Sequence, residues 1–187
     1  MTQYEPGPMI SHEQEAEIFE RLNRAPSARG FVIAMVEVFD DMLDQLIQKV
    51  FRKDDYAVKF AVEPLLGTMG PLADLTVRLK LIYGLGIISQ QLYQDIDRLL
   101  RLRDFLNSQG QEYRLTDPEI AEPLKALHMV AAMEVQPFSV PVAATDLEPA
   151  LLQMQQLRQE QVIRSALALA VAGACSEMMR NNPLFAG

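Results

Sequence analysis

The sequence has little cysteine, no tryptophan and a shortage of basic charge. Its single cysteine, Cys175, has no second cysteine with which to form an internal disulfide. The 17 Lys and Arg residues stand against 25 Asp and Glu, which gives a formal net charge of -8. A negative protein is repelled by phosphate backbones and by anionic lipid at long range. The composition therefore argues against a nonspecific nucleic-acid binder and against a membrane-surface protein.

Leader signals and long apolar runs are also missing. The first residues, MTQYEPGPMISHEQ, lack a basic region followed by an apolar run, so no secretory signal is visible. The longest uncharged stretch of the C-terminal half is Ser165 to Ser176, and a membrane-spanning helix needs roughly 20 apolar residues. These features predict a cytoplasmic protein in which this stretch is a buried helix segment and Cys175 is inert packing.

Apolar side chains are plentiful and recur with helical spacing. The chain has 187 residues and is 49% hydrophobic, which is enough for a sizeable core. Spacings of three, four and seven residues predict a long helix that Pro26 opens and that ends near Val50. Similar patterns recur along the chain, so we predict an all-α fold without a sheet. We expect a flexible tail at residues 1–10 and one multihelical regulatory domain of about six to eight helices at residues 11–187.

Caps, prolines and glycines divide the rest of the chain into further helices. Ser11 and Gln14 have the spacing of a capping box, which predicts a short surface helix after residue 11. The other expected helices run from Tyr56 to about Leu66, from Pro71 to Gly84, from a cap at Ser89 to about Asn107, from Pro118 to Val130, and from Pro149 to Met179 or Arg180. Residues 133–144 contain two prolines and predict an extended connection.

Acidic side chains lie on one face of the long helix. They are Glu37, Asp40, Asp41 and Asp44. Helical nucleotide pyrophosphatases hold magnesium with carboxylates at similar spacing, but such a site needs acids from a second, facing helix. The remaining acids are scattered singly or sit beside arginines. We therefore interpret this face as a solvated acidic surface available for protein contacts, and predict no metal, cofactor or catalytic residue.

One arginine falls inside an apolar seam. Positions i, i+4, i+7, i+11 and i+14 of the helix after Ser89 are Leu92, Ile96, Leu99, Arg103 and Leu106. Because a buried guanidinium needs an acidic partner, Arg103 is predicted as a buried structural charge paired with Glu63 or Asp74. The alternative is an arginine that reaches past the core to water. Asp74 and Arg78, four residues apart, can also pair.

Two helices around a glycine turn raise the question of DNA binding. Residues 72–104 could form a helix-turn-helix-like unit in which glutamines read bases and arginines contact phosphates. These side chains are Gln90, Gln91, Arg98, Arg101 and Arg103. However, the turn from Tyr83 to Ser89 is longer than this motif uses. Acidic thirds of the chain also flank the unit, so we interpret the pair as a packing scaffold and expect no direct DNA binding.

The same central stretch carries a family resemblance. The segments are FRKDDYAVKFAVEPLL, GPLADLTVRLKLIYGLG and LYQDIDRLLRLRDFLN, and together they resemble the mannitol operon repressor family. The resemblance implies a cytoplasmic, all-helical repressor of genes for mannitol uptake by the phosphotransferase system. It supplies no catalytic or ligand residues. With the acidic balance, it predicts a transcriptional regulator, not an enzyme, that contacts a transcription factor or a phosphotransferase component.

A metabolite sensor remains an alternative function. A pocket for mannitol 1-phosphate would need basic side chains that converge on the phosphate. The nearest supply is Arg78, Lys80, Arg98 and Arg101. His128 is interpreted as a core or rim histidine, because the other histidine lies in the N-terminal segment. Arg98 and Arg101 face away from the seam, so they join the acidic residues as a candidate interaction surface, and an oligomer stays open.

Overall fold

The computed structural model describes residues 10–51, 56–138 and 148–180, and these residues fold as α-helices without a strand. The predicted all-α class with six to eight helices is confirmed. The helices are α1 (His12–Arg24), α2 (Ala28–Val50), α3 (Tyr56–Leu66), α4 (Leu75–Gly84), α5 (Gln90–Ser108), α6 (Pro118–Lys125), α7 (His128–Ala131) and α8 (Pro149–Arg180), with a 3-10 turn η1 at Pro71–Ala73. Residues 1–9 of the expected tail lie outside the described residues, and Ile10 is buried.

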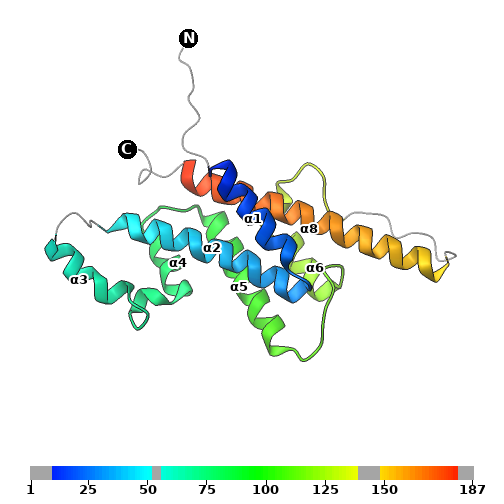
Figure 1. The fold of residues 1–187 in the computed structure, drawn as a ribbon, viewed down its shortest axis with the longest axis horizontal. Coiled ribbons are helices and arrows are strands. Elements are labelled where there is room, and N and C mark those ends of the chain that lie inside the picture. The colour runs from blue at the N-terminus through cyan, green and yellow to red at the C-terminus, as the bar shows by residue number, and fades with distance from the viewer. Residues whose placement is uncertain (1–9, 52–55, 139–147, 181–187) are drawn as a thin grey trace, which may run out of the picture.

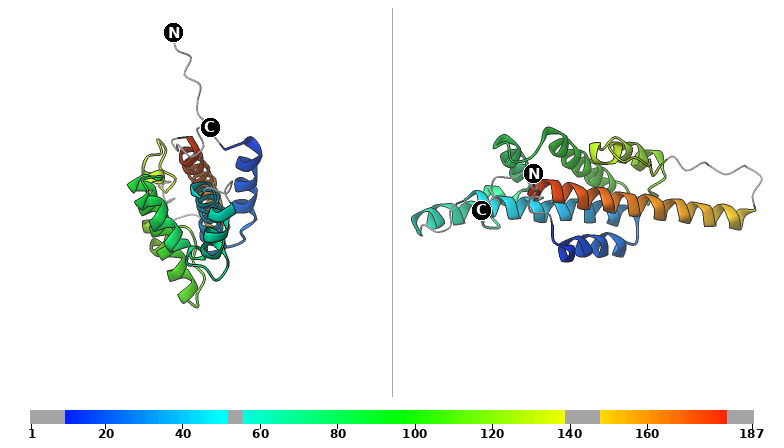
Figure 2. Two further views of the ribbon diagram at one scale, coloured as in Figure 1. Left: turned by 90° about the vertical axis from the view of Figure 1, so that its left-hand side faces the viewer. Right: turned by 90° about the horizontal axis from the view of Figure 1, so that it is seen from above.

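Helix α2 is the centre of the fold. It packs against α1, α4, α5 and α8 (Figure 1), and Phe31, Met35 and Phe39 on it are completely buried. Seen from above, α2 and α8 run side by side, with α1 on one side of them and α5 and α6 on the other (Figure 2). The predicted apolar stripe of α2 therefore became the main core surface.

Local side-chain caps set the starts of α1, α2, α4 and α5. At α1, the Ser11 hydroxyl accepts from Gln14 N at 3.1 Å and the Gln14 side chain accepts from Ser11 N at 3.0 Å, so the capping box is confirmed. The start of α2 differs from the prediction by two residues. It begins at Ala28 and not at Pro26, because the Ser27 hydroxyl accepts from Gly30 N and Ser27 is the N-cap.

The start of α4 also differs from the prediction. Pro71 opens the short turn η1, and α4 begins four residues later at Leu75. Asp74 caps it by accepting from Thr76 N at 2.7 Å and Val77 N at 3.2 Å. These backbone hydrogen bonds, from Val77 and Thr76, lower the pKa of Asp74. Asp74 is thus a helix cap, and the carboxylates that form ion pairs with Arg78 come from another helix.

The expected helix from Pro118 to Val130 is broken in two. Helix α6 ends at Lys125, and α7 starts again at His128. The cause lies in α5, where the buried carboxylate of Asp95 accepts from the backbone N–H groups of His128, at 2.7 Å, and Met129, at 2.9 Å. A carboxylate that satisfies the first N–H groups of a helix acts as its cap. The chain therefore starts a new helix where Asp95 holds it.

Helix α8 spans Pro149–Arg180, as expected from the sequence, and its two halves differ. The first half projects beyond the other helices (Figures 1 and 2), while the second half is packed against α1 and α7. The stretch from Ser165 to Ser176, predicted as a buried helix segment, is helical and largely buried, but Leu169 within it is 56% exposed. By length and composition alone α8 could cross a membrane, but 44% of its apolar 18-residue window is buried in the fold, and core helices of soluble proteins meet the same criterion.

Helix α3 has the predicted bounds but little packing. It lies at the end of the molecule beyond α2 (Figure 1), and its main neighbour is η1. None of its residues is buried, and Val58 and Val62 are only half-buried. Pro64 lies inside the helix, within three residues of its end. The core therefore places few constraints on α3.

Candidate functional site: an acidic groove between two helices

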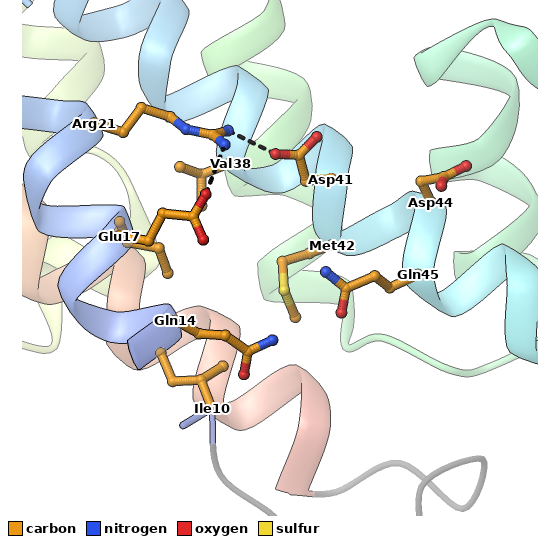
Figure 3. A pocket seen from close by; sticks show the side chains of 10 residues that line it. Ile10, Gln14, Glu17, Arg21, Val38, Asp41, Met42, Asp44 and Gln45 are labelled. Atoms are coloured by element: carbon orange, nitrogen blue, oxygen red, sulfur yellow. Dashed lines mark hydrogen bonds and ion pairs between the residues drawn. The ribbon is translucent and has the colours of Figure 1, made fainter. Parts of the chain in front are cut away.

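A groove of about 290 Å³ runs between α1 and α2 (Figure 3). Ile18 and Leu22 of α1 are buried against the core. Polar side chains of α1 and α2 line the space beside this contact. Residues from the chain entering α1, from α1 itself and from α2 line it. They are Ile10, Gln14, Glu17, Ile18, Arg21, Val38, Asp41, Met42, Asp44 and Gln45.

The groove carries more negative than positive charge. Its lining holds Glu17, Asp41 and Asp44 against one cation, Arg21. Arg21 bridges the helices, with Nη1 2.6 Å from Asp41 Oδ2 and Nη2 3.6 Å from Glu17 Oε1 (Figure 3). The hydrogen bond to Asp41 raises the pKa of Arg21. Asp44 also lies 3.5 Å from Nη1 of Arg78, which is shared with Asp40, so the carboxylates still outnumber the guanidiniums and the groove attracts basic groups.

Apolar side chains form the floor of this groove. Ile10, Ile18, Val38 and Met42 are buried members of its lining, and the amides of Gln14 and Gln45 stand at its edge (Figure 3). Protein interfaces combine an apolar centre with a polar or charged rim in this way. The groove can therefore receive an apolar side chain of a partner that is flanked by basic residues.

The four acids expected on one face of α2 have different roles. Asp41 and Asp44 line the groove. Asp40 faces α4, where it accepts a hydrogen bond from Arg78. Glu37 is exposed outside the lining. The partners of Asp40, Asp41 and Asp44 are arginines, and among the described residues no group of three or more His, Cys, Asp or Glu side chains is placed to hold a metal ion.

The buried arginine is Arg78, and not Arg103 as predicted. Arg103 keeps a side-chain exposure of 31% and donates to the adjacent Asp104, with Nη2 2.9 Å from Oδ1. Its guanidinium reaches water at the edge of the seam and meets neither Glu63 nor Asp74. Arg78 is only 7% exposed and lies between Asp40 and Asp44 of α2, with Nη1 3.5 Å from Asp44 Oδ1. The ion pair therefore joins α4 to α2.

Arg98 and Arg101 lie at a different cleft, of about 520 Å³, between α5 and α6. Arg98 donates to the backbone oxygen of Ala126, and Arg101 Nε donates to Asp97 at 2.9 Å. The six candidate interaction residues thus do not form one surface. The predicted phosphate site is not assembled either, because Arg78 does not line this cleft and is paired with two carboxylates.

The α4–α5 pair is a packing unit. Leu79, Ile82, Ile96 and Leu99 are buried, as expected of a packing scaffold, and α5 packs against α2. The ring of Tyr83 stacks on that of Tyr93 at 4.5 Å between centroids. All three arginines of α5 already donate to acceptors within the chain. Few basic groups of this unit are left to contact phosphates.

Sequence reasoning missed the role of Asp95. The carboxylate is 1% exposed and also lies 2.9 Å from Nδ1 of His128. A signal was present, because Asp95 is three residues after Leu92 and four before Leu99, which places it on the apolar side of its helix. His128 is a rim histidine, as interpreted from the sequence, with a side-chain exposure of 38%.

Comparison with known proteins gives a consistent result. The family model described as "Mannitol repressor" (MtlR) matches residues 14–179. The chain is 46% identical, over 164 residues, to the mannitol operon repressor of Escherichia coli K12, covering 88% of this chain and 82% of that protein. It is similar to a chain in the X-ray structure of the MtlR–HPr complex from E. coli, with a TM-score of 0.79, 45% identity, and coverage of 90% of this chain and 99% of that one. A further relative, fumarase E of E. coli K12, is 25% identical over 175 residues, 88% of this chain and 96% of that protein.

Proposed function

This chain belongs to the mannitol repressor family, and we propose that it represses mannitol uptake and utilisation genes by binding a protein partner, without contacting operator DNA itself. The observation that carries the proposal is the similarity to the E. coli repressor chain solved together with HPr. We infer that the partner of this chain is likewise a component of the phosphotransferase system of the HPr type.

The acidic groove is the docking surface that we propose for this partner. Glu17, Asp41 and Asp44 surround an apolar floor, and Arg21 together with the Arg78 ion pair to Asp44 offsets only part of their charge. Complementary charge increases the rate of association and selects the correct partner, while the apolar centre excludes water. The partner face is therefore expected to present basic side chains around an apolar residue.

Charge also supports the indirect mechanism. The net charge of -8 repels a DNA backbone. The helix pair that could have read DNA uses its seam for the core and its arginines for internal hydrogen bonds. A repressor with these properties acts through another protein, and a regulator of gene expression works in the cytoplasm.

Calorimetric titration with HPr from the same organism tests the docking surface. Glu17→Lys and Gln45→Lys place positive charge in the groove without touching the Arg78 ion pair, so each is expected to raise the Kd by about three- to tenfold. Glu134→Lys is the matched control, because Glu134 is exposed beyond α7 and does not line the groove. Equal effects of Glu17→Lys and Glu134→Lys would place the partner elsewhere.

An anisotropy titration with the mannitol promoter at low salt tests the indirect mechanism. Low salt maximises electrostatic attraction to DNA. We expect no saturable binding by the chain alone. Specific binding at nanomolar concentration without a second protein would refute the indirect mechanism.

We also propose that the chain is not an enzyme, although one relative is named fumarase E. An enzyme that binds a dicarboxylate needs cations free to receive two carboxylates. Arg98 and Arg101 share one cleft, but Ala126 and Asp97 already accept their hydrogen bonds. The absorbance of fumarate incubated with the purified chain is therefore expected to stay constant. A loss of fumarate absorbance in proportion to protein concentration would assign hydratase activity.

A further inference from the structure

A second pocket, of about 260 Å³, lies between α5, α7 and α8 and shares no lining residue with the acidic groove. Its polar lining comes from Ser89, Gln91, Asp95, His128 and Glu177. Its α8 wall is made of small residues, and an added Cβ at Gly173 would meet no atom within 4 Å. The pocket is open enough to admit a small molecule.

The imidazole of His128 is held in one orientation in this pocket. The side chain of Asp95 is 2% exposed. Its carboxylate lies 2.9 Å from Nδ1 of His128 and accepts hydrogen bonds from the backbone N–H groups of His128 and Met129 at the start of α7. An ionised carboxylate can only accept, so Nδ1 of His128 carries the proton. The other ring nitrogen, Nε2, then has a free lone pair in the neutral imidazole and can accept from a ligand hydroxyl.

Other polar groups of the lining are available to a ligand. In the part of the chain that the structure describes, the side chains of Gln91 and Glu177 make no hydrogen bond or ion pair. Ser89 uses an oxygen lone pair to cap α5, where it accepts from Leu92 N at 3.2 Å, so its O–H can still donate. Hydroxyl, amide, imidazole and carboxylate groups thus stand around one space.

We propose that this pocket binds a small, neutral polyol, and that D-mannitol is the member of this class to which it responds. Adjacent hydroxyls both donate and accept, which matches a lining of one carboxylate acceptor, one imidazole acceptor, one amide and one hydroxyl. The lining includes no Lys or Arg, and the carboxylate of Glu177 repels a phosphate, whereas Asp95 is partly offset by Arg98 outside the lining, with Nη1 3.9 Å from Asp95 Oδ1. The pocket therefore discriminates against mannitol 1-phosphate. The identity of the polyol rests on the proposed function, whereas the chemical class rests on the lining.

Saturation-transfer NMR and calorimetry with D-mannitol, sorbitol and mannitol 1-phosphate test this assignment on the full chain. D-mannitol is expected to bind saturably, and mannitol 1-phosphate at least about tenfold more weakly. His128→Ala and Glu177→Gln each remove one ligand partner and are expected to weaken D-mannitol binding about tenfold. His12→Ala is the control, since His12 is exposed on α1. Circular dichroism establishes that each variant is folded.

Three outcomes would overturn the polyol site: no saturable D-mannitol binding by the native chain, unchanged binding by both folded pocket variants, or tighter binding of mannitol 1-phosphate. Sorbitol binding equal to that of D-mannitol would retain the chemical class but reject the assigned polyol. The HPr titration is performed without polyol. Failure of polyol binding therefore leaves the proposed protein contact intact, and failure of HPr binding leaves the polyol site intact.

Discussion

Arg78 and Arg103 carry the same charge but differ in environment. Arg78 lies between Asp40 and Asp44 with 7% of its surface exposed, whereas Arg103 is partly exposed and bonded to its neighbour in sequence. Arg78→Met removes the link between α4 and α2. We expect it to lower the free energy of unfolding by about 1 to 3 kcal/mol in urea denaturation, since both carboxylates remain half-exposed and regain water.

Arg103→Met is the matched control for that substitution. A partly exposed ion pair contributes about 0 to 1 kcal/mol, so this variant should remain close to the native stability. If Arg103→Met were as destabilising as Arg78→Met, the assignment of the structural ion pair to Arg78 would be wrong.

Cys175 is a second residue whose chemistry follows from burial. Desolvation raises the pKa of its thiol to about 12. Only the thiolate reacts readily with disulfide reagents, so the native chain is expected to be unreactive at pH 8. Release of thionitrobenzoate on adding urea should follow the unfolding transition. Rapid reaction of the native chain would show that this part of α8 opens locally.

Helix α4 depends on its cap for its start. Hydrogen bonds from the backbone of Val77 and Thr76 lower the pKa of Asp74 below its ordinary value of 3.8. For a carboxyl with a depressed folded-state pKa, the stabilisation is present above the ordinary pKa and is lost as pH falls through the folded-state pKa. Asp74→Ala should therefore lower the free energy of unfolding near pH 7. The difference in free energy of unfolding between this variant and the native chain should become smaller below pH 3.8. Urea denaturation across this range measures the difference, and a constant difference would contradict the charged cap.

Helix α3 should open more easily than the other long helices. It has no buried residue, and the exposed fractions of Tyr56 and Phe60 are 83% and 72%. Local opening is easiest where few apolar contacts are lost. In hydrogen–deuterium exchange, amides of residues 58–66 are expected to exchange much faster than those of α2. Protection of the α3 amides comparable to that of α2 would indicate a partner that covers α3. Repeating the exchange over a series of protein concentrations would reveal such a partner.

At the scale of the whole molecule, a single core connects the described helices, and α3 contacts it only through the partly buried Leu66. Buried residues extend from Ile10, before α1, to Met178, near the end of α8. We propose on this basis that residues 10–180 form one folding unit. Circular dichroism and fluorescence should then report coincident transitions in urea. Separate transitions would divide the chain into two domains.

The sequence alone determined the elements that depend on neighbours in the chain. The Ser11–Gln14 capping box, the bounds of α3 and the end of α8 were correct, because caps and apolar periodicity act over a few residues. The overall acidity also follows from composition. These features predicted the all-α class and argued against direct DNA binding.

Tertiary structure decided which charges meet. Arg78 pairs with Asp40 from 38 residues away, Arg21 with Asp41 from 20, and Asp95 reaches the start of α7 across 33. A periodic pattern indicates which side of its own helix a residue occupies. It does not indicate which other helix faces that side, or the position of that helix along the shared axis. The groove, the Arg78 ion pair and the polyol pocket each require side chains from at least two helices. They arise only when packing of α2 against its neighbours sets those relative positions.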